Sequence, residues 1–258
     1  MKHFPWVLVV LLAGCIEPTK PVSGAATLED IDRETDARRS AIHDMNADVS
    51  MSAEGLEKSG SFSGVIVYQP PGNFRMDAIK RMGPTLFTFT MVDDAFRLHI
   101  LAENKLVRGS VRGQERKHPE LVAAFAWLAE RREADEERKL EEEAPDHFTI
   151  LTTRGGKPAR RTVIERPSLF VTQITLIGDD GKETAQVRMT DYREVKTPQA
   201  KPGPSAWVPW KTVVTGRKED GGTYTVETKM NRVYLNEGIE PGTFNMEVPE
   251  GATVEEAR

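Results

Sequence analysis

The chain has 258 residues, with 35 lysines and arginines, 40 aspartates and glutamates, and a formal net charge of −5. Its 38% hydrophobic and 29% charged residues are ordinary for a globular domain that can bury a full core. The mild acidity, together with the lack of a basic stripe interleaved with aromatic residues, argues against nucleic acid as a partner.

The first 15 residues have the layout of a secretory signal. A short, weakly basic start precedes an apolar run over residues 4–12, and small residues follow it. The run is shorter than the about 20 apolar residues of a membrane-spanning helix. Cys15 is the only cysteine of the chain and comes directly after Ala13 and Gly14. This motif resembles the bacterial lipobox, which implies cleavage between Gly14 and Cys15 and acylation of Cys15 with chains such as palmitate.

A lipid on Cys15 would hold the protein on a membrane. Each buried methylene contributes about 0.8 kcal/mol, and two or more acyl chains anchor a protein stably. Ile16 stands where an aspartate keeps such proteins in the inner membrane of enteric-type bacteria, so the resemblance implies the periplasmic side of the outer membrane. We therefore expect a signal peptide over residues 1–14, a lipidated flexible tether over 15–26 and a folded domain over 27–258.

An amphipathic helix is predicted at the start of the domain, over residues 27–44. Thr27 can cap its N-terminus. Apolar residues from Leu28 to Met45 recur at roughly helical spacing, and charged residues fill the opposite face. Such a helix can cover one face of a sheet.

Period-two alternation dominates the next part of the chain. Short strands are expected over residues 60–68, 73–80, 85–92 and 95–101, with one face rich in phenylalanine and methionine and the other polar. Turn signals separate these strands at a spacing of about 11 residues, which is typical of an antiparallel meander.

A charged helical insertion is predicted at about residues 118–143. Its first part has an apolar side, whereas residues 129–143 are almost wholly charged. Opposite charges four positions apart, such as Arg138 and Glu142, would stabilise a solvated helix by about 0.2–0.5 kcal/mol per pair. The alternative interpretation of this segment is an acidic docking surface for a periplasmic protein partner.

Strand patterns return after Pro145 and continue almost to the end of the chain. A Gly-Asp-Asp-Gly sequence at residues 178–181 is a strong hairpin signal. The expected strands lie at residues 148–153, 161–166, 170–177, 186–193, 207–215 and 223–231, and the chain closes with 233–235 and 244–254. About 11 strands without βαβ alternation indicate a mainly β (α+β) fold with an antiparallel sheet.

Motifs for catalysis are absent from the sequence. It contains no G-x-S-x-G elbow, no Ser-x-x-Lys motif and no glycine-rich phosphate loop. No pair of histidines has a metal-ligand spacing. We therefore expect neither an enzyme nor a metal or cofactor site. A secreted hydrolase would need His99 or His147 to cluster with carboxylates in a pocket.

Large apolar side chains on the strands are the remaining feature. One interpretation is a core closed by the helices. The other is a curved, incompletely closed sheet whose concave side takes acyl chains, since methionines repack around variable guests and apolar clefts bind apolar ligands. The candidate residues for this lining are Phe62, Phe74, Met76, Phe87, Phe89, Met91, Phe96, Phe170 and Trp207.

Three segments resemble the LolA/LolB-like family of periplasmic lipoprotein carriers and receptors. Residues 73–76, the loop 81–83 and the following Phe/Thr strand are similar to the third strand, protruding loop and fourth strand of the receptor. Residues 177–181 resemble a hairpin of the carrier. Residues 244–254 are similar to its closing pattern F-x-x-x-x-P-x-G-x-x-V.

The resemblance implies an antiparallel incomplete β-barrel whose helices cover the concave face. It also implies a function without catalysis: an outer-membrane lipoprotein that binds lipid, acyl chains or lipoproteins, in lipoprotein sorting or envelope lipid handling. Met82 matches an apolar residue on the receptor's membrane-facing loop. The alternative function is a non-transporting envelope interaction or sensor protein on the same scaffold, which would use the charged segment 129–143 to dock a partner.

Overall fold

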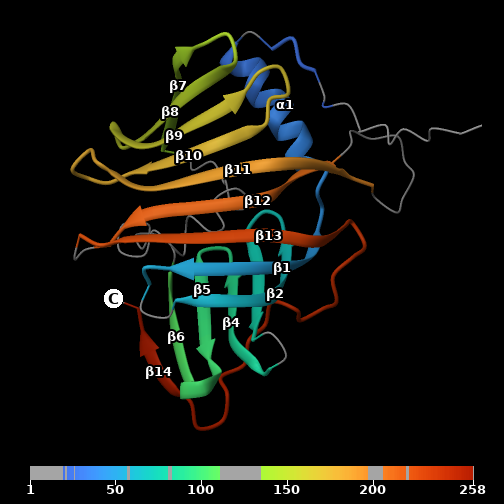
Figure 1. Ribbon diagram of the computed structural model, residues 1–258, viewed down its shortest axis with the longest axis vertical. Coiled ribbons are helices and arrows are strands. Elements are labelled where there is room, and N and C mark those ends of the chain that lie inside the picture. Colours follow the sequence, from blue (N-terminus) through green and yellow to red (C-terminus); the bar gives the residue numbers. More distant parts are fainter. Residues whose placement is uncertain are drawn as a thin grey trace, which may run out of the picture.

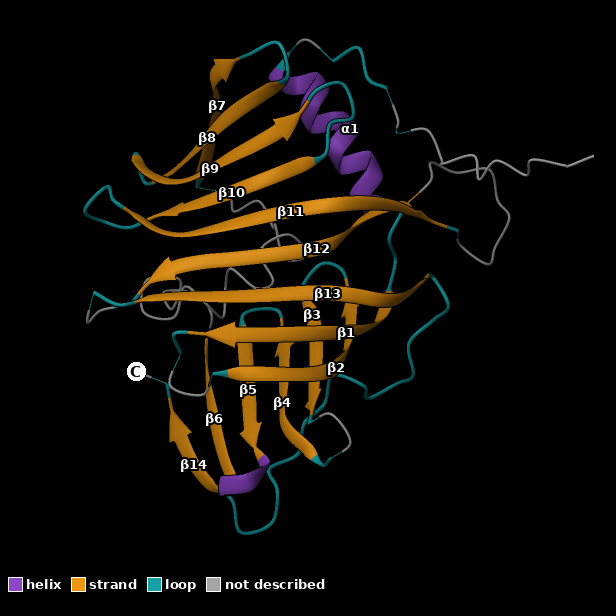
Figure 2. Cartoon of the chain, viewed as in Figure 1, coloured by secondary structure: helices purple, strands orange, loops and turns teal. Residues whose placement is uncertain are grey.

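The structure is a computed structural model that describes residues 20, 22–25, 27–56, 59–80, 83–110, 135–196, 206–218 and 221–257. Within these residues the chain forms one sheet of 14 strands, one α-helix and one short 3-10 helix (Figure 2). The mainly β prediction is confirmed. Covering of the concave face by several helices is not confirmed, because the described residues contain a single α-helix, α1 (Leu28–Ser40).

Two antiparallel meanders make up the sheet. The first consists of β1 (Met45–Glu54), β2 (Gly60–Gln69), β3 (Asn73–Ile79), β4 (Thr85–Val92), β5 (Ala95–Ile100) and β6 (Lys105–Ser110), with the 3-10 helix Leu101–Glu103 before β6. The second consists of β7 (Glu136–Glu143), β8 (His147–Arg154), β9 (Lys157–Glu165), β10 (Val171–Ile177), β11 (Glu183–Val195), β12 (Ala206–Arg217) and β13 (Thr223–Leu235). A last strand, β14 (Thr253–Glu256), pairs in parallel with β6.

The two meanders join in the middle of the sheet, where β1 pairs with β13. The strand order is β14-β6-β5-β4-β3-β2-β1-β13-β12-β11-β10-β9-β8-β7, so β14 and β7 are the edges. Figure 1 shows these edges at opposite ends of the molecule, with strand directions that turn from β11–β13 to β4–β6. The sheet is therefore curled but open, and its free edges carry charged residues of the kind that discourages edge-to-edge pairing.

The number of strands exceeds the prediction of about 11 because three charged or mixed segments also form strands. Residues 45–54 form β1, between the predicted helix 27–44 and the first predicted strand 60–68. Residues 105–110 form β6, where no strand was predicted. β6 pairs with β14, which overlaps the predicted closing segment 244–254, and Lys105 and Glu255 form an ion pair across the two strands with an N–O distance of 2.8 Å. The third segment is β7.

Residues 136–143 form β7, so the prediction of a helix is wrong for this part of 118–143. Burial along β7 alternates, with Glu136, Arg138 and Leu140 half-buried and the residues between them exposed. The Glu136 carboxylate accepts from Arg154 at 2.9 Å and Arg160 at 3.1 Å, on β8 and β9. Ladder hydrogen bonds and these cross-strand ion pairs outweigh the weak pairing that spacing by four would provide in a helix. Residues 111–134 lie outside the described residues.

The helix α1 ends at Ser40, four residues before its predicted end. The side chain of Asn236, which follows β13, accepts from the His43 N–H at 2.7 Å and donates to the Ala41 carbonyl at 2.9 Å. This contact between residues 193 positions apart turns the chain into β1. At the other end the prediction is confirmed, because the Thr27 hydroxyl accepts from the Asp30 N–H at 3.2 Å.

The buried apolar residues form two clusters. A main core combines inward-facing residues of β1–β5 with those of β10–β13, among them Phe74, Met76 and Val214. A smaller core lies under α1, where Ile31 packs on Phe148, Ile150, Ile164 and Leu169.

Replacing Ile31 with alanine should destabilise the protein by about 2–5 kcal/mol, since Ile31 is fully buried and is the buried residue of α1. Urea denaturation would measure the loss. Ala37→Gln on the exposed side of α1 is the control, with an expected change within about 0.5 kcal/mol. Equal effects of the two changes would contradict the docking of α1 through Ile31.

The C-terminal segment lies across the polar face of β3–β6. Arg75 donates to the Thr243 carbonyl at 2.9 Å, Arg97 donates to the Met246 carbonyl, and Asn104 donates to the Glu250 carbonyl at 3.1 Å. The predicted closing strand over 244–254 is therefore mostly an irregular segment, which becomes a strand at Thr253. Polar side chains from the sheet donate hydrogen bonds to the carbonyl groups of the C-terminal segment, whose described residues have no strand-to-strand hydrogen bonds before Thr253.

Candidate functional site: a cleft between helix α1 and the sheet

A cleft of about 110 Å³ lies between α1 and strands β10–β12. Its sheet side is formed mainly by apolar residues, including Ile174 on β10, Met189 on β11 and Trp207 on β12. Arg38 and Arg39 on the last turn of α1 form part of the opposite side. The cleft is therefore apolar on the sheet and basic on the helix.

Three aromatic rings form the apolar wall of the cleft. Phe170 stacks on Tyr192 with ring centroids 4.2 Å apart and packs on Trp207 at 5.4 Å. The Tyr192 hydroxyl donates to the Val171 carbonyl at 2.6 Å, which satisfies its polar group at the edge of the cleft. Phe170 reaches this position through the turn before β10, where Leu169 has a φ of 54° and its N–H donates to the Glu165 carbonyl at 2.8 Å.

The basic side of the cleft comes from neighbouring residues of α1. Arg38 donates to the carbonyl of Ser168, and its guanidinium carbon lies 5.7 Å from the Phe170 ring centroid. Burial lowers the pKa of Arg38, and the charge of Glu34 partly opposes this effect. Arg39 forms an ion pair with Asp36 at 3.4 Å. Basic residues in a last turn also interact favourably with the helix dipole.

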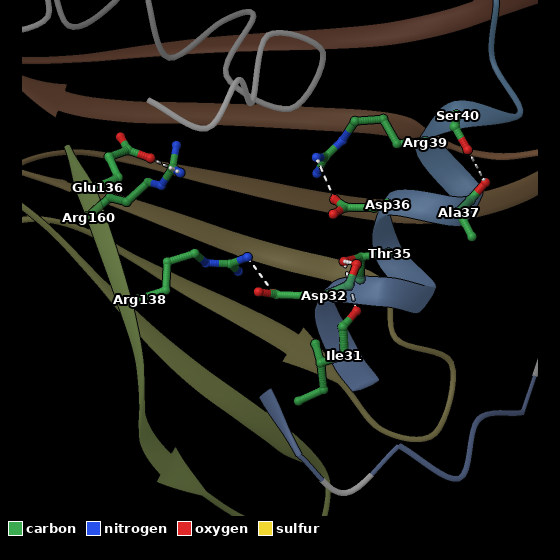
Figure 3. Close-up of polar contacts among 10 residues, drawn as sticks. All are labelled: Ile31, Asp32, Thr35, Asp36, Ala37, Arg39, Ser40, Glu136, Arg138 and Arg160. Carbon is green, nitrogen blue, oxygen red and sulfur yellow. Dashed lines mark hydrogen bonds and ion pairs between the residues drawn. The ribbon is translucent and has the colours of Figure 1, made fainter. Parts of the chain in front are cut away.

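An ion pair links α1 to β7 at the edge of the sheet (Figure 3). Arg138 on β7 pairs with Asp32 on α1, and both side chains are mostly buried. Glu136, beside it on β7, has a side chain only 3% exposed and lies between Arg154 and Arg160. Removing one member of the Arg138–Asp32 pair would leave a mostly buried charge uncompensated, so this pair helps to hold the helix that forms one side of the cleft.

The predicted lining residues divide into two groups. Phe170 and Trp207 line the cleft. Phe74, Met76, Phe89, Met91 and Phe96 are buried in the main core, and Phe62 and Phe87 pack at its boundary with their ring centroids 5.8 Å apart. The role of the seven β2–β5 residues as acyl-cavity lining stays a prediction. Gly14, Cys15 and Met82 lie outside the described residues.

Arg38, Arg39 and Tyr192 were missed as candidate site residues. The pair of arginines at the end of a predicted helix was visible in the sequence, but nothing there places it beside Phe170. The contact between Arg38 and Ser168 joins residues 130 positions apart. The only signal at Tyr192 was the alternation of apolar and polar residues in its segment. That pattern predicts a strand and gives no indication of a cleft.

The histidines do not contribute to this cleft in the part of the chain that the structure describes. His99 contacts Asn104 at 3.3 Å, and His147 contacts Asp146 at 2.8 Å and Glu142 at 3.8 Å at the surface. Among the described residues, no three His, Cys, Asp or Glu side chains are grouped as a metal site requires. No helix among them has the length and apolar character needed to cross a membrane.

Comparison with known proteins identifies the fold. No family model and no curated protein matches the sequence. Among solved structures, a candidate outer membrane lipoprotein-sorting protein domain from Vibrio parahaemolyticus is similar over 84% of this chain and 95% of its own, with 14% identity and a TM-score of 0.63.

Two further solved structures agree with this similarity. A DUF1329 family protein from Desulfovibrio piger has 12% identity and a TM-score of 0.61, covering 83% of this chain and 94% of its own. A LolA superfamily protein from Nitrosomonas europaea has 10% identity and a TM-score of 0.56, covering 86% of this chain and 99% of its own. Together with the open antiparallel sheet and its helix, these similarities show that the chain has the LolA/LolB-like fold.

Proposed function

We propose that this protein is a periplasm-facing outer-membrane lipoprotein that binds lipid or acyl chains in the cleft beside α1, in lipoprotein sorting or envelope lipid handling. The observation that carries the proposal is the apolar cleft with its wall of Phe170, Tyr192 and Trp207. The names of two proteins of the same fold, which refer to lipoprotein sorting and the LolA superfamily, support it. Cys15 is the proposed lipid attachment site and Met82 the proposed membrane-facing loop residue.

Burial of hydrocarbon drives the proposed binding, at about 25 cal/mol per Å² of apolar surface removed from water. No covalent bond is made or broken. The volume of about 110 Å³ is smaller than the about 300–1,000 Å³ of a typical ligand pocket. A cleft of this size therefore takes part of an acyl chain.

A neutral fluorescent probe, N-phenyl-1-naphthylamine, tests the proposal on the chain from residue 15 onward with Cys15→Ser. We expect the probe to bind and a synthetic diacylated lipopeptide to displace it. Trp207→Ala should weaken probe binding about tenfold or more, because losing the contact with one large side chain costs about 1.5–3 kcal/mol.

The matched control is Trp210→Ala. Trp210 also lies on β12, but it packs under Arg193, whose guanidinium carbon is 4.9 Å from its ring, and it is not part of the cleft wall. Its replacement should change probe affinity less than twofold. Absence of probe binding, or equal losses in the two tryptophan variants, would contradict lipid binding in this cleft.

One observation favours the alternative, a non-transporting envelope interaction or sensor protein on the same scaffold. The phenylalanine and methionine face of β3–β5 is packed in the main core. A wild-type chain that binds neither probe nor lipopeptide would support this alternative.

A further inference from the structure

We propose that the cleft selects amphiphiles with an anionic head, a carboxylate or a phosphate, which Arg38 and Arg39 bind while a hydrocarbon chain lies against Phe170 and Trp207. The inference rests on the proposed function and adds the chemical class of the ligand. It follows from the charge of the cleft, the partners of the two arginines and the position of the aromatic wall.

The charge of the cleft has one sign. Among its described lining residues, Arg38 and Arg39 are cationic and none is acidic. A third cation, Lys20, lies 5.9 Å from the centroid of the Phe170 ring, on which Arg38 also packs. An amphiphile whose chain contacts Phe170 would therefore have its head close to positive charge.

The hydrogen-bond partner of Arg38 is a neutral group, so it does not balance the positive charge of the guanidinium. Arg38 donates to a neutral carbonyl, that of Ser168, and within the described residues no carboxylate lies within ion-pair distance of it. Glu34, one helical turn earlier, acts on it only through its charge. A half-buried guanidinium has five N–H donors, and a carboxylate or phosphate can accept two of them side by side.

The carboxylates around the other two cations are held by weak surface pairs. Asp36 pairs with Arg39 at 3.4 Å, and Glu165 pairs with Lys20 at 3.5 Å. The Arg39 side chain is 33% exposed and that of Lys20 is 56% exposed. Exposed ion pairs of this kind contribute only about 0–1 kcal/mol to stability. An anionic head can therefore bind these cations at a small cost in the free energy of the existing ion pairs.

The position of the aromatic wall determines where the head and the hydrocarbon chain of the ligand would lie in the cleft. Arg38 packs on the ring of Phe170, and Phe170 packs in turn on Tyr192 and Trp207 along the sheet. A head bound at Arg38 therefore places the first carbons of its chain on Phe170. The chain then continues over the apolar residues of β10 and β11, including Ile174 and Met189.

The test is displacement of N-phenyl-1-naphthylamine by four ligands with the same twelve-carbon chain: dodecanoate, dodecyl phosphate, 1-dodecanol and dodecylphosphocholine. We expect the two anions to displace the probe at about tenfold lower concentration than dodecanol, as a charge-assisted hydrogen bond provides. A preference for dodecanoate would identify a fatty acid as the source of the head, and a preference for dodecyl phosphate a lipid phosphate.

Arg38→Gln should remove the preference for the anions, so that dodecanoate and dodecyl phosphate displace the probe at about the same concentration as dodecanol. Arg33→Gln is the matched control, because Arg33 lies on the exposed side of the same helix and pairs with Asp30 at 2.5 Å. It should keep the tenfold preference.

If dodecanoate and dodecyl phosphate both displace the probe only at the same concentration as dodecanol, the inference is overturned while the proposed lipid binding stands. Equal loss of preference in the Arg33 and Arg38 variants would also overturn it, because the effect would then come from net charge. If none of the four ligands displaces the probe but the diacylated lipopeptide does, the inference is overturned and the proposed function stands. If the lipopeptide also fails to displace it, the proposed function itself is contradicted.

Discussion

A chain with Cys15→Ala is expected to leave the membrane fraction and appear in the soluble fraction of a Gram-negative host. Two or more acyl chains, at about 0.8 kcal/mol per buried methylene, hold a protein on a bilayer far more strongly than any single contact within it. Without the thiol at residue 15, no diacylglycerol can be attached. This change therefore has the largest effect that we expect for any single substitution.

This effect can be measured by cell fractionation, by density-gradient separation of the two membranes and by metabolic labelling with an alkynyl palmitate. The wild-type protein should carry the label and sediment with the outer membrane. Ser23→Ala, in the proposed tether, should behave like the wild type. Mass spectrometry that finds Cys15 unmodified in the wild type, or a variant that stays with the membrane, would contradict the lipid anchor.

Phe74→Ala is expected to lower the free energy of unfolding by about 3–5 kcal/mol. Phe74 is 1% exposed, and its ring packs edge-to-face on Phe89 with centroids 6.0 Å apart. Its cross-strand neighbours on β2 and β4 are Tyr68 and Met91. Removing the ring leaves a cavity in the main core, and these neighbours can fill it only in part.

Chemical denaturation measures the loss, and Val92→Ala is the control, since Val92 on β4 is 42% exposed and should cost about 0.5 kcal/mol or less. Probe binding by the folded Phe74 variant should stay within twofold of the wild type, whereas Phe170→Ala should weaken it. A Phe74 variant with native stability and impaired probe binding would instead assign the β2–β5 face to the ligand cavity.

Local patterns were sufficient for β2–β5 of the first meander, but they did not predict β1 or β6. The predicted strands at 60–68 and 85–92 agree with β2 and β4 to within a residue, because the residues of each segment alternate with a period of two, as a strand requires. The Gly178–Gly181 hairpin is confirmed for a similar reason, since the Gly178 N–H donates to the Lys182 carbonyl at 2.8 Å and Gly181 has a φ of 77°.

The errors have a common physical cause. Met45 fits the apolar spacing of α1 as well as the alternation of β1, and only the contact of Asn236 with the chain around Ala41 decides between them. The charged residues of β7 fit both helical spacing and cross-strand pairing. The partners that select the strand, Arg154 and Arg160, come later in the chain and on neighbouring strands.

The order of apolar and polar residues, by itself, determined the mainly β class, the antiparallel strands β2–β5 and the capped start of α1. Each of these features depends on neighbours within a few positions. Only the tertiary structure decided where the sheet ends, that β1 meets β13, and that Arg38 lies beside Phe170. These features depend on contacts between distant segments, whose free energies arise only once the whole sheet has formed and α1 has docked on it.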